Sequence, residues 1–293
     1  MATLQNKIDF AVVFTVKNAN PNGDPLNGNR PRTNYDNLGE VTDVCLKRKM
    51  RDRLMEKHDI FVQSDDRKKD DATSLRDRAE KALGSAFNTP KMREEACKIW
   101  LDVRAFGQLF AYKGGGKKGK GKKNAEPGSE EGDESGSGSD SGVSIGIRGP
   151  VSVHSAFSVV PIDITSTQIT KSVSGEGDGK KRASDTMGMK HRVDHGVYVF
   201  YGSMNPQLAE RTGFSDADAE AIKKILPRMF ENDASSARPE GSMAVKEVLW
   251  WKHDSKAGQY SSAKVHQTVK VDAQGNITET PLANLRAERI PGF

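Results

Sequence analysis

Four segments of strand composition, separated by helical patterns and long polar stretches, limit the folds that this chain can adopt. The first, "IDFAVVFTV" at residues 8–16, alternates loosely and is rich in β-branched and aromatic residues, as in a strand with one buried face. The others lie within 143–162, 197–204 and 246–255. Helical patterns at 43–57 and 215–230 fall between strands, so the order predicts a four-stranded ferredoxin-like or RRM-like α+β core.

The composition is compatible with a protein that works in the cytoplasm. The length of 293 residues allows one large domain or two ordinary ones, and the hydrophobic content of 35% predicts a modest core. Cys45 and Cys97 lie in helical patterns without a CxxC pair, which argues against a disulfide scaffold. The N-terminus has no signal-peptide pattern, and no stretch approaches the roughly 18 apolar residues of a membrane span. We expect no membrane partner.

The stretch "NANPNGDPLNGNRPRTNYDNLG" at 18–39 leaves the first strand and ends beside an unusually basic helix. Its prolines exclude a regular helix, and its glycines permit left-handed turns. A basic helix is often only a solvated face, but amide and guanidinium groups together bind phosphates, sugars and base edges. We therefore predict an RNA-binding surface, formed by Asn20, Asn22, Arg30, Arg32, Lys47, Arg48, Lys49 and Arg51.

A second polar stretch, 172–196, carries Met187 and Met189 just before Lys190, His191 and Arg192. One interpretation is that the methionines pack back on the core. The other is an apolar wedge, flanked by cations, that enters between the bases of a single strand. Residues 113–142 pass from a basic half to an acidic Gly/Ser half, which predicts a disordered insert without a core.

The patterns that would indicate an enzyme are weak. "HRVDH" spaces His191 and His195 like two metal ligands on a helix, but glycines bracket it and a strand follows. "GEGDGKK" lacks the spacing and the hydroxyl residue of a phosphate loop. Asp24 and Asp36 have no evident carboxylate partner for a metal-dependent nuclease. We predict no catalytic residue, no metal and no cofactor.

Five blocks of the sequence resemble a known family. The blocks at 20–33, 41–54, 102–110, 146–153 and 187–206 are similar, in the same order, to the backbone subunit of the type I-C CRISPR interference complex, Cascade. This is the Cas-seven family of RAMP proteins. The resemblance implies one hand-shaped domain, 1–293, with a modified RRM/ferredoxin-like palm, a helical finger insertion and a long thumb loop. The implied palm comprises 8–17, 92–110, 143–165, 197–204 and 215–255; the guide-binding loop is 18–40, the fingers 41–91 and the thumb 172–195.

The resemblance also implies a function. Copies of such a subunit form a helical filament along the spacer of a CRISPR RNA, and the thumb kinks the guide so that the intervening bases pair with target DNA. The implied partners are the CRISPR RNA, target DNA, further copies of the chain, other Cascade subunits and a helicase-nuclease. Arg148, within the fourth block, joins the expected RNA contacts, with Met187 and Met189 as the thumb wedge.

Two alternatives stay open from the residues. One is a CRISPR-repeat endoribonuclease on a related fold, for which His191 or His195 would be the general base. The other is a protein-only scaffold whose basic helix pairs with acidic partners.

Overall fold

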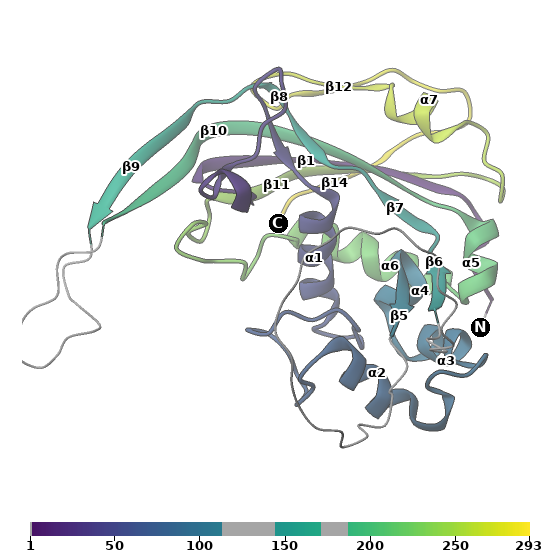
Figure 1. Ribbon diagram of the computed structural model, residues 1–293. Coiled ribbons are helices and arrows are strands. Elements are labelled where there is room, and N and C mark those ends of the chain that lie inside the picture. The colour runs from purple at the N-terminus through teal and green to yellow at the C-terminus, as the bar shows by residue number, and fades with distance from the viewer. Residues whose placement is uncertain (1, 113–143, 171–186) are drawn as a thin grey trace, which may run out of the picture.

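The computed structural model describes residues 2–112, 144–170 and 187–293, and it is built around a large antiparallel sheet (Figure 1). The predicted insert 113–142 and residues 172–186 of the predicted thumb lie outside the described residues. The sheet has eight strands in the order β14-β11-β1-β10-β8-β4, with β7 and β9 also paired to β10. Their bounds are β1 Ile8–Ala19, β4 Leu38–Val41, β7 Val151–Val153, β8 Ala156–Pro161, β9 Ile164–Thr170, β10 Met187–Met204, β11 Met243–Lys252 and β14 Glu288–Pro291.

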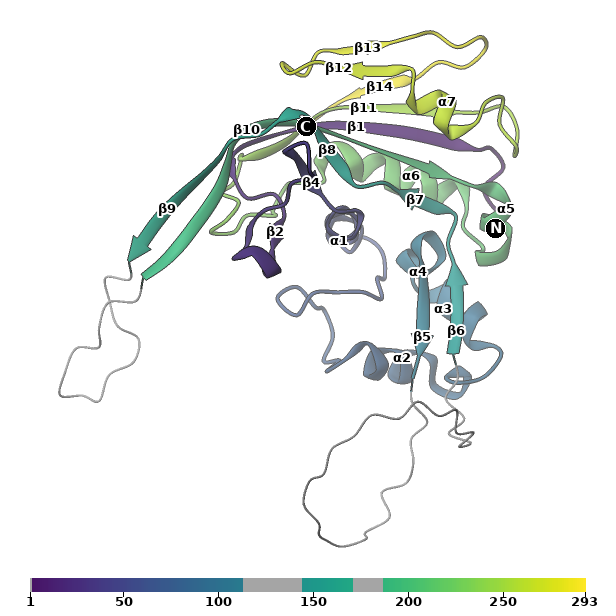
Figure 2. The same cartoon turned by 45° about the horizontal axis from the view of Figure 1, so that its top comes forward.

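The predicted first strand is confirmed as the central strand β1, which pairs with both β10 and β11. On one face of the sheet Phe14 lies opposite Tyr198, with ring centroids 5.3 Å apart, and Phe10 stacks on Trp250 at 5.7 Å. Helices α1 (Asp43–Leu54) and α6 (Asp216–Ile225) cover this face (Figure 2). Successive side chains of a strand point to opposite faces of the sheet, so these aromatic residues share one face. That face is buried under the two helices.

The two helices follow the sequence pattern. Leu46, Met50 and Leu54 of α1 are buried as the predicted apolar stripe, and Thr42 caps the helix by accepting from the Cys45 N–H. The helix ends three residues before the predicted boundary. α6 begins with a capping box at Ser215, whose side chain and that of Asp218 exchange hydrogen bonds with each other's backbone N–H groups. Short elements flank α6: α5 Pro206–Thr212 and η3 Leu226–Arg228.

The C-terminal segment covers part of the other face of the sheet. It contains α7 (Ser262–His266), β12 (Val269–Val271) and β13 (Ile277–Glu279), and then returns to the sheet edge as β14. A small core around Trp251 attaches it. The sequence interpretation of an irregular tail was wrong, because elements of three to five residues are too short to show a periodic pattern.

A separate helical unit lies below the sheet in Figures 1 and 2. It consists of α2 (Leu75–Leu83), η2 (Gly84–Ala86), α3 (Met92–Ile99), α4 (Leu101–Phe106) and the ribbon β5 (Gly107–Ala111) with β6 (Ser144–Arg148). The single helix predicted over 92–110 was wrong. Trp100 is extended (φ −103°, ψ 121°) and packs on Phe61, and Gly107 has φ 82°, where β5 begins. The helical pattern is therefore interrupted by tertiary packing.

The asparagine-rich stretch is more ordered than a loop. It contains the ribbon β2 (Gly23–Asp24) and β3 (Arg30–Pro31), the turn η1 (Pro25–Asn27) and strand β4. Gly28 and Asn29 both have φ 57°, so the tight turn between β2 and β3 uses the two residue types that best tolerate this conformation. Within the described ranges, no helix is long and apolar enough to span a membrane.

Candidate nucleic-acid interface

The second polar stretch forms one arm of a long β-hairpin. Met187–Val193 of β10 pair with Ile164–Thr170 of β9, and the hairpin projects beyond the sheet towards the side that carries α1 (Figures 1 and 2). The long loop predicted there was wrong for residues 187–195, which are a strand. Side chains alternate between the two faces of a strand. The register therefore puts Met187, Met189 and His191 on one face, and Lys190 and Arg192 on the other.

The face with the methionines looks inward, towards the concave side of the molecule. Val193 is the next residue on this face, and it is buried in the same core cluster as Leu46 and Met50 of α1. Met187 and Met189 themselves are 67% and 56% exposed, so the interpretation that they pack back on the core was wrong. The cluster of Lys190, His191 and Arg192 is divided, because only His191 shares the methionine face.

The asparagine-rich segment is fastened to the base of this hairpin. Arg30 Nη1 donates to Ser166 Oγ at 3.3 Å, and the same hydroxyl lies 2.8 Å from His191 Nδ1. Arg32 forms an ion pair with Asp24 at 3.3 Å. Asp24 also caps η1 by accepting from the Leu26 N–H. Both arginines therefore lie at the inner surface. Each of them already has a partner within the protein when no RNA is bound.

Asn20 and Asn22, which were predicted as RNA contacts, hold the asparagine-rich segment in place. Asn20 is buried, and its Nδ2 donates to the Asn29 carbonyl at 2.6 Å. Asn22 Oδ1 accepts from both the N–H and the hydroxyl of Thr42, at 3.0 and 2.9 Å. These bonds tie the ribbon β2–β3 to the N-terminus of α1. Asn20 Nδ2 and Asn22 Oδ1 are therefore engaged inside the protein.

The basic cluster on α1 is divided between structural and exposed charges. Lys49 is buried and forms an ion pair with Asp233; burial lowers the pKa of its ammonium group. Arg51 Nε donates at 2.9 Å to Asp102, a buried carboxylate that also accepts from the Phe61 N–H. The two cations hold α1 to neighbouring segments rather than face solvent.

Of the other charges of the cluster, Arg48 is exposed and Lys47 is half-buried, with 23% of its side chain exposed. Lys47 pairs with Asp43 at 2.9 Å, and the 56%-exposed Arg48 makes only long contacts, 3.5 Å to Asp66 and 3.8 Å to Asp52. Solvent-exposed pairs of this kind are weak, so their cations remain available to an anion. Arg148 is exposed on β6, which lies on the far side of α1 from the hairpin in both views (Figures 1 and 2). The structure does not bring it near the others.

The geometry of the two histidines excludes a shared metal. His191 and His195 both belong to strand β10, where four residues span about 13 Å. Among the described residues, no group of three or more His, Cys, Asp or Glu side chains is arranged to hold a metal ion.

One segment at the interface was not predicted from the sequence. The loop 231–242, between η3 and β11, lies between the hairpin and α1 in both views (Figures 1 and 2). It provides Asp233 for Lys49, and its Ala237 carbonyl accepts from the Asn20 N–H at 2.9 Å. "ENDASSARPEGS" has no periodic or motif signal, so only the fold identifies its position.

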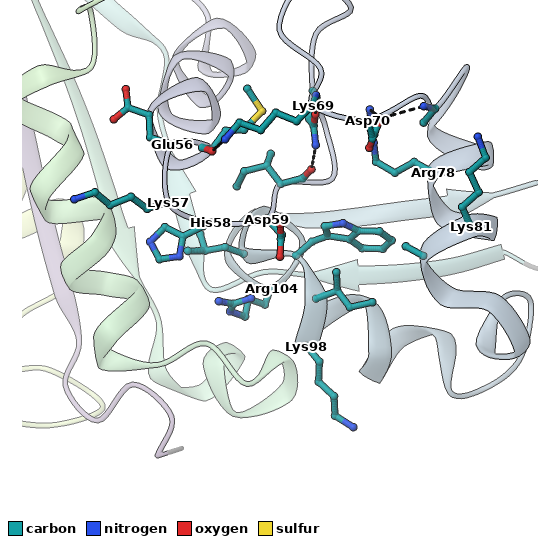
Figure 3. A pocket seen from close by; sticks show the side chains of 18 of the residues that line it. Glu56, Lys57, His58, Asp59, Lys69, Asp70, Arg78, Lys81, Lys98 and Arg104 are labelled. Atoms are coloured by element: carbon teal, nitrogen blue, oxygen red, sulfur yellow. Dashed lines mark hydrogen bonds and ion pairs between the residues drawn. The ribbon is translucent and has the colours of Figure 1, made fainter.

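A cavity of about 920 Å³ lies elsewhere, between the end of α1 and the helical unit (Figure 3). Arg78, a buried residue of the cavity wall, donates hydrogen bonds from Nε and Nη2 to Asp70 and from Nη1 to the Phe61 carbonyl. Lys69 donates to the Met55 carbonyl across the wall. These charged groups serve the packing of the helical unit.

This chain of mixed α and β structure is a CRISPR-associated protein, as comparison of its sequence with known families shows. The sequence profile of the family described as CRISPR-associated protein Cas7 matches residues 6–289, and the chain belongs to this family. A curated relative, the CRISPR-associated protein Cas7 of Haloferax volcanii, is 26% identical over 245 residues, which cover 80% of this chain and 67% of that protein.

Solved structures show partial similarity. A chain of a CRISPR RNA-guided surveillance complex in a pre-nicking state aligns with a TM-score of 0.44 and 14% identity, over 84% of this chain and 78% of its own length. A chain of another such surveillance complex aligns with a TM-score of 0.42 and 16% identity, over 92% and 77%. A chain of the Type III-B Cmr-beta complex bound to cognate target RNA gives 0.38 and 10%, over 84% and 61%.

Proposed function

We propose that this chain is a non-catalytic backbone subunit that binds a CRISPR RNA. The observation that carries the proposal is the inward face of the hairpin, where two exposed methionines and His191 lie beside the arginine-bearing ribbon β2–β3. An apolar group next to cations suits a single strand, since bases need a partner for stacking and phosphates need charge. Membership of the Cas7 family supports a role in CRISPR defence.

The strand order supports a palm of the RRM type. In chain order, β1, β8, β10 and β11 are the first to fourth strands of the core, and their spatial order is fourth, first, third, second. Helices α1 and α6 lie on one face, as in a ferredoxin-like unit. An RRM binds RNA on its open face. Here the C-terminal segment covers part of that face, which favours the concave side, with the hairpin as thumb and the helical unit as fingers.

Guide binding of this kind does not depend on sequence. Lys47 and Arg48 would contact phosphates, and Met187 and Met189 would separate neighbouring bases. Sequence is then recognised by pairing between the guide and target DNA. We further propose that copies of the chain form a helical filament along the spacer of the CRISPR RNA in a type I-C Cascade. The filament would join the other subunits of that complex, and the complex would recruit a helicase-nuclease in the cytoplasm.

The wedge has a matched control on its own hairpin. Ile169 is 49% exposed and lies opposite Gly188, on the face away from the methionines. We expect Met187→Ala with Met189→Ala to weaken guide-RNA binding by about tenfold, the effect of one lost base contact. Ile169→Ala should leave affinity unchanged. Equal effects of the two changes in a fluorescence-anisotropy titration would contradict the wedge.

Two simple measurements test the proposal against its alternatives. Sequencing the RNA that co-purifies with the chain should return CRISPR spacers, whereas a protein-only scaffold carries no nucleic acid. Incubation with repeat RNA in the absence of divalent ions should leave the RNA intact. Cleavage that His191→Ala abolishes would establish the endoribonuclease and refute the non-catalytic proposal.

A further inference from the structure

We infer that Arg238, on the loop 231–242, is a contact for the RNA backbone, with a phosphate as its ligand. This inference rests on the proposed function, because it assigns a further residue to the same interface. We call residues 231–242 the Arg238 loop.

The Arg238 loop is held against the centre of the interface. Its Ala237 carbonyl accepts from the Asn20 N–H, at the start of the asparagine-rich segment. Next to that point, Cys45 Sγ of α1 lies 3.8 Å from the Pro21 carbonyl. Arg238 is thus attached where β1, the ribbon and α1 meet.

A shared carboxylate determines how Arg238 is placed. Asp233 pairs with the buried Lys49, and its Oδ2 also accepts from Arg238 Nε at 3.0 Å. A buried ammonium needs a counter-ion, which explains Asp233. One carboxylate neutralises one cation, so the second cation is in excess. Since Lys49 is 4% and Arg238 27% exposed, the excess positive charge lies at the solvent side.

The guanidinium keeps donors for a ligand. Arg238 donates to Asp233 through Nε. Within the described parts of the chain no partner is found for its Nη1 or Nη2. A guanidinium held by one nitrogen presents its other N–H groups in a fixed fork, which matches two phosphate oxygens. Phosphate, rather than a base edge, is the ligand expected of a protein that must accept any spacer sequence.

The test is a salt titration of RNA binding by the full chain, followed by fluorescence anisotropy. Arg238→Gln should lower affinity by about tenfold, as expected for loss of a charged hydrogen bond. The slope of log K against log salt should fall by about 0.7, the value for one phosphate of a single strand. The loss should be equal for labelled oligouridine and oligoadenine, and Arg238→Lys should restore part of it.

Arg289 provides the matched control. It is 48% exposed and pairs with Glu247 at 2.6 Å, on β14, the edge of the sheet opposite β4. Arg289→Gln should leave both affinity and slope unchanged. Thermal unfolding checks that the Arg238 variants fold, since the pair of Lys49 with Asp233 is kept in them.

The outcomes separate the inference from the proposed function. If the wild type binds RNA and Arg238→Gln behaves like Arg289→Gln, Arg238 is no contact but the proposed function stands. A loss confined to one of the two RNAs would mean a base contact and would overturn the phosphate assignment. If the wild type binds no RNA in any form, both are wrong.

Discussion

Removing the hydroxyl of Tyr198 should stabilise this protein. Tyr198 lies in β10 as part of the main core, stacked on Phe14, and its side chain is fully buried. Its hydroxyl is buried without a hydrogen-bond partner among the described residues, and burial raises the pKa of the phenol. Tyr198→Phe removes this group and retains the ring.

The magnitude follows from the burial. An unpaired buried hydroxyl costs about 1–3 kcal/mol, and the oxygen returns only a few contacts of ~0.1–0.2 kcal/mol each. We therefore expect Tyr198→Phe to raise the free energy of unfolding by about 1–2 kcal/mol. For a chain of this size, that corresponds to a rise of roughly 2–4 °C in Tm.

The assay is urea unfolding followed by tryptophan fluorescence, with thermal unfolding as a second measure. Tyr260→Phe is the control, because the Tyr260 hydroxyl donates to the Ala283 carbonyl at 3.0 Å. Its loss should cost about 0.5 kcal/mol. Opposite signs for the two Tyr→Phe changes are therefore expected. A destabilised Tyr198→Phe would show that the hydroxyl has a stabilising partner.

A second change checks the same site by coupling. A Cβ at Gly39 would lie 2.1 Å from the Tyr198 hydroxyl oxygen and 2.8 Å from its Cζ. Gly39→Ala should therefore destabilise by about 1–3 kcal/mol through overpacking. In the double variant, Tyr198→Phe should relieve part of this cost, so the two effects should not add. Additive effects would refute the contact.

Two further predictions concern the charges. Arg51→Ala should lower the free energy of unfolding by about 3 kcal/mol, because it leaves the buried Asp102 carboxylate without its cation, whereas Arg48→Ala should change it by less than ~1 kcal/mol. Urea unfolding measures both, and equal losses would contradict the division of the basic cluster. Burial lowers the pKa of His266 below its ordinary 6.5, despite the attraction of Asp9, so the unfolded chain binds the proton more readily. Stability should fall as the pH drops below 6.5, and His266→Gln should flatten this part of the Tm profile; an unchanged profile would refute the assignment.

The periodic parts of the fold were predictable from the sequence. The apolar stripe of α1 and the alternation of β1 each record, within one segment, which side of that segment is buried. The break at Trp100 was not predictable, since it depends on packing against Phe61, a residue far away in the chain. The C-terminal elements were missed because each is too short to repeat a pattern.

The site was predictable only as a region. The sequence places five cations within residues 47–53, but their partners come from distant segments: Asp233 for Lys49 and Asp102 for Arg51. These partners decide which charges are structural and which face solvent. Composition carries no information about such pairs, because it does not record which segments meet.

By itself the sequence determined that this protein has a sheet with helices on one face, a basic first helix and a methionine-bearing polar stretch that resembles a guide-binding family. Only the tertiary structure decided which side of that stretch faces inward, because the pairing register of β9 with β10 assigns each side chain to a face. It also decided that the Arg238 loop lies at the interface. Local periodicity is encoded within a segment, whereas register and proximity are set by contacts between segments.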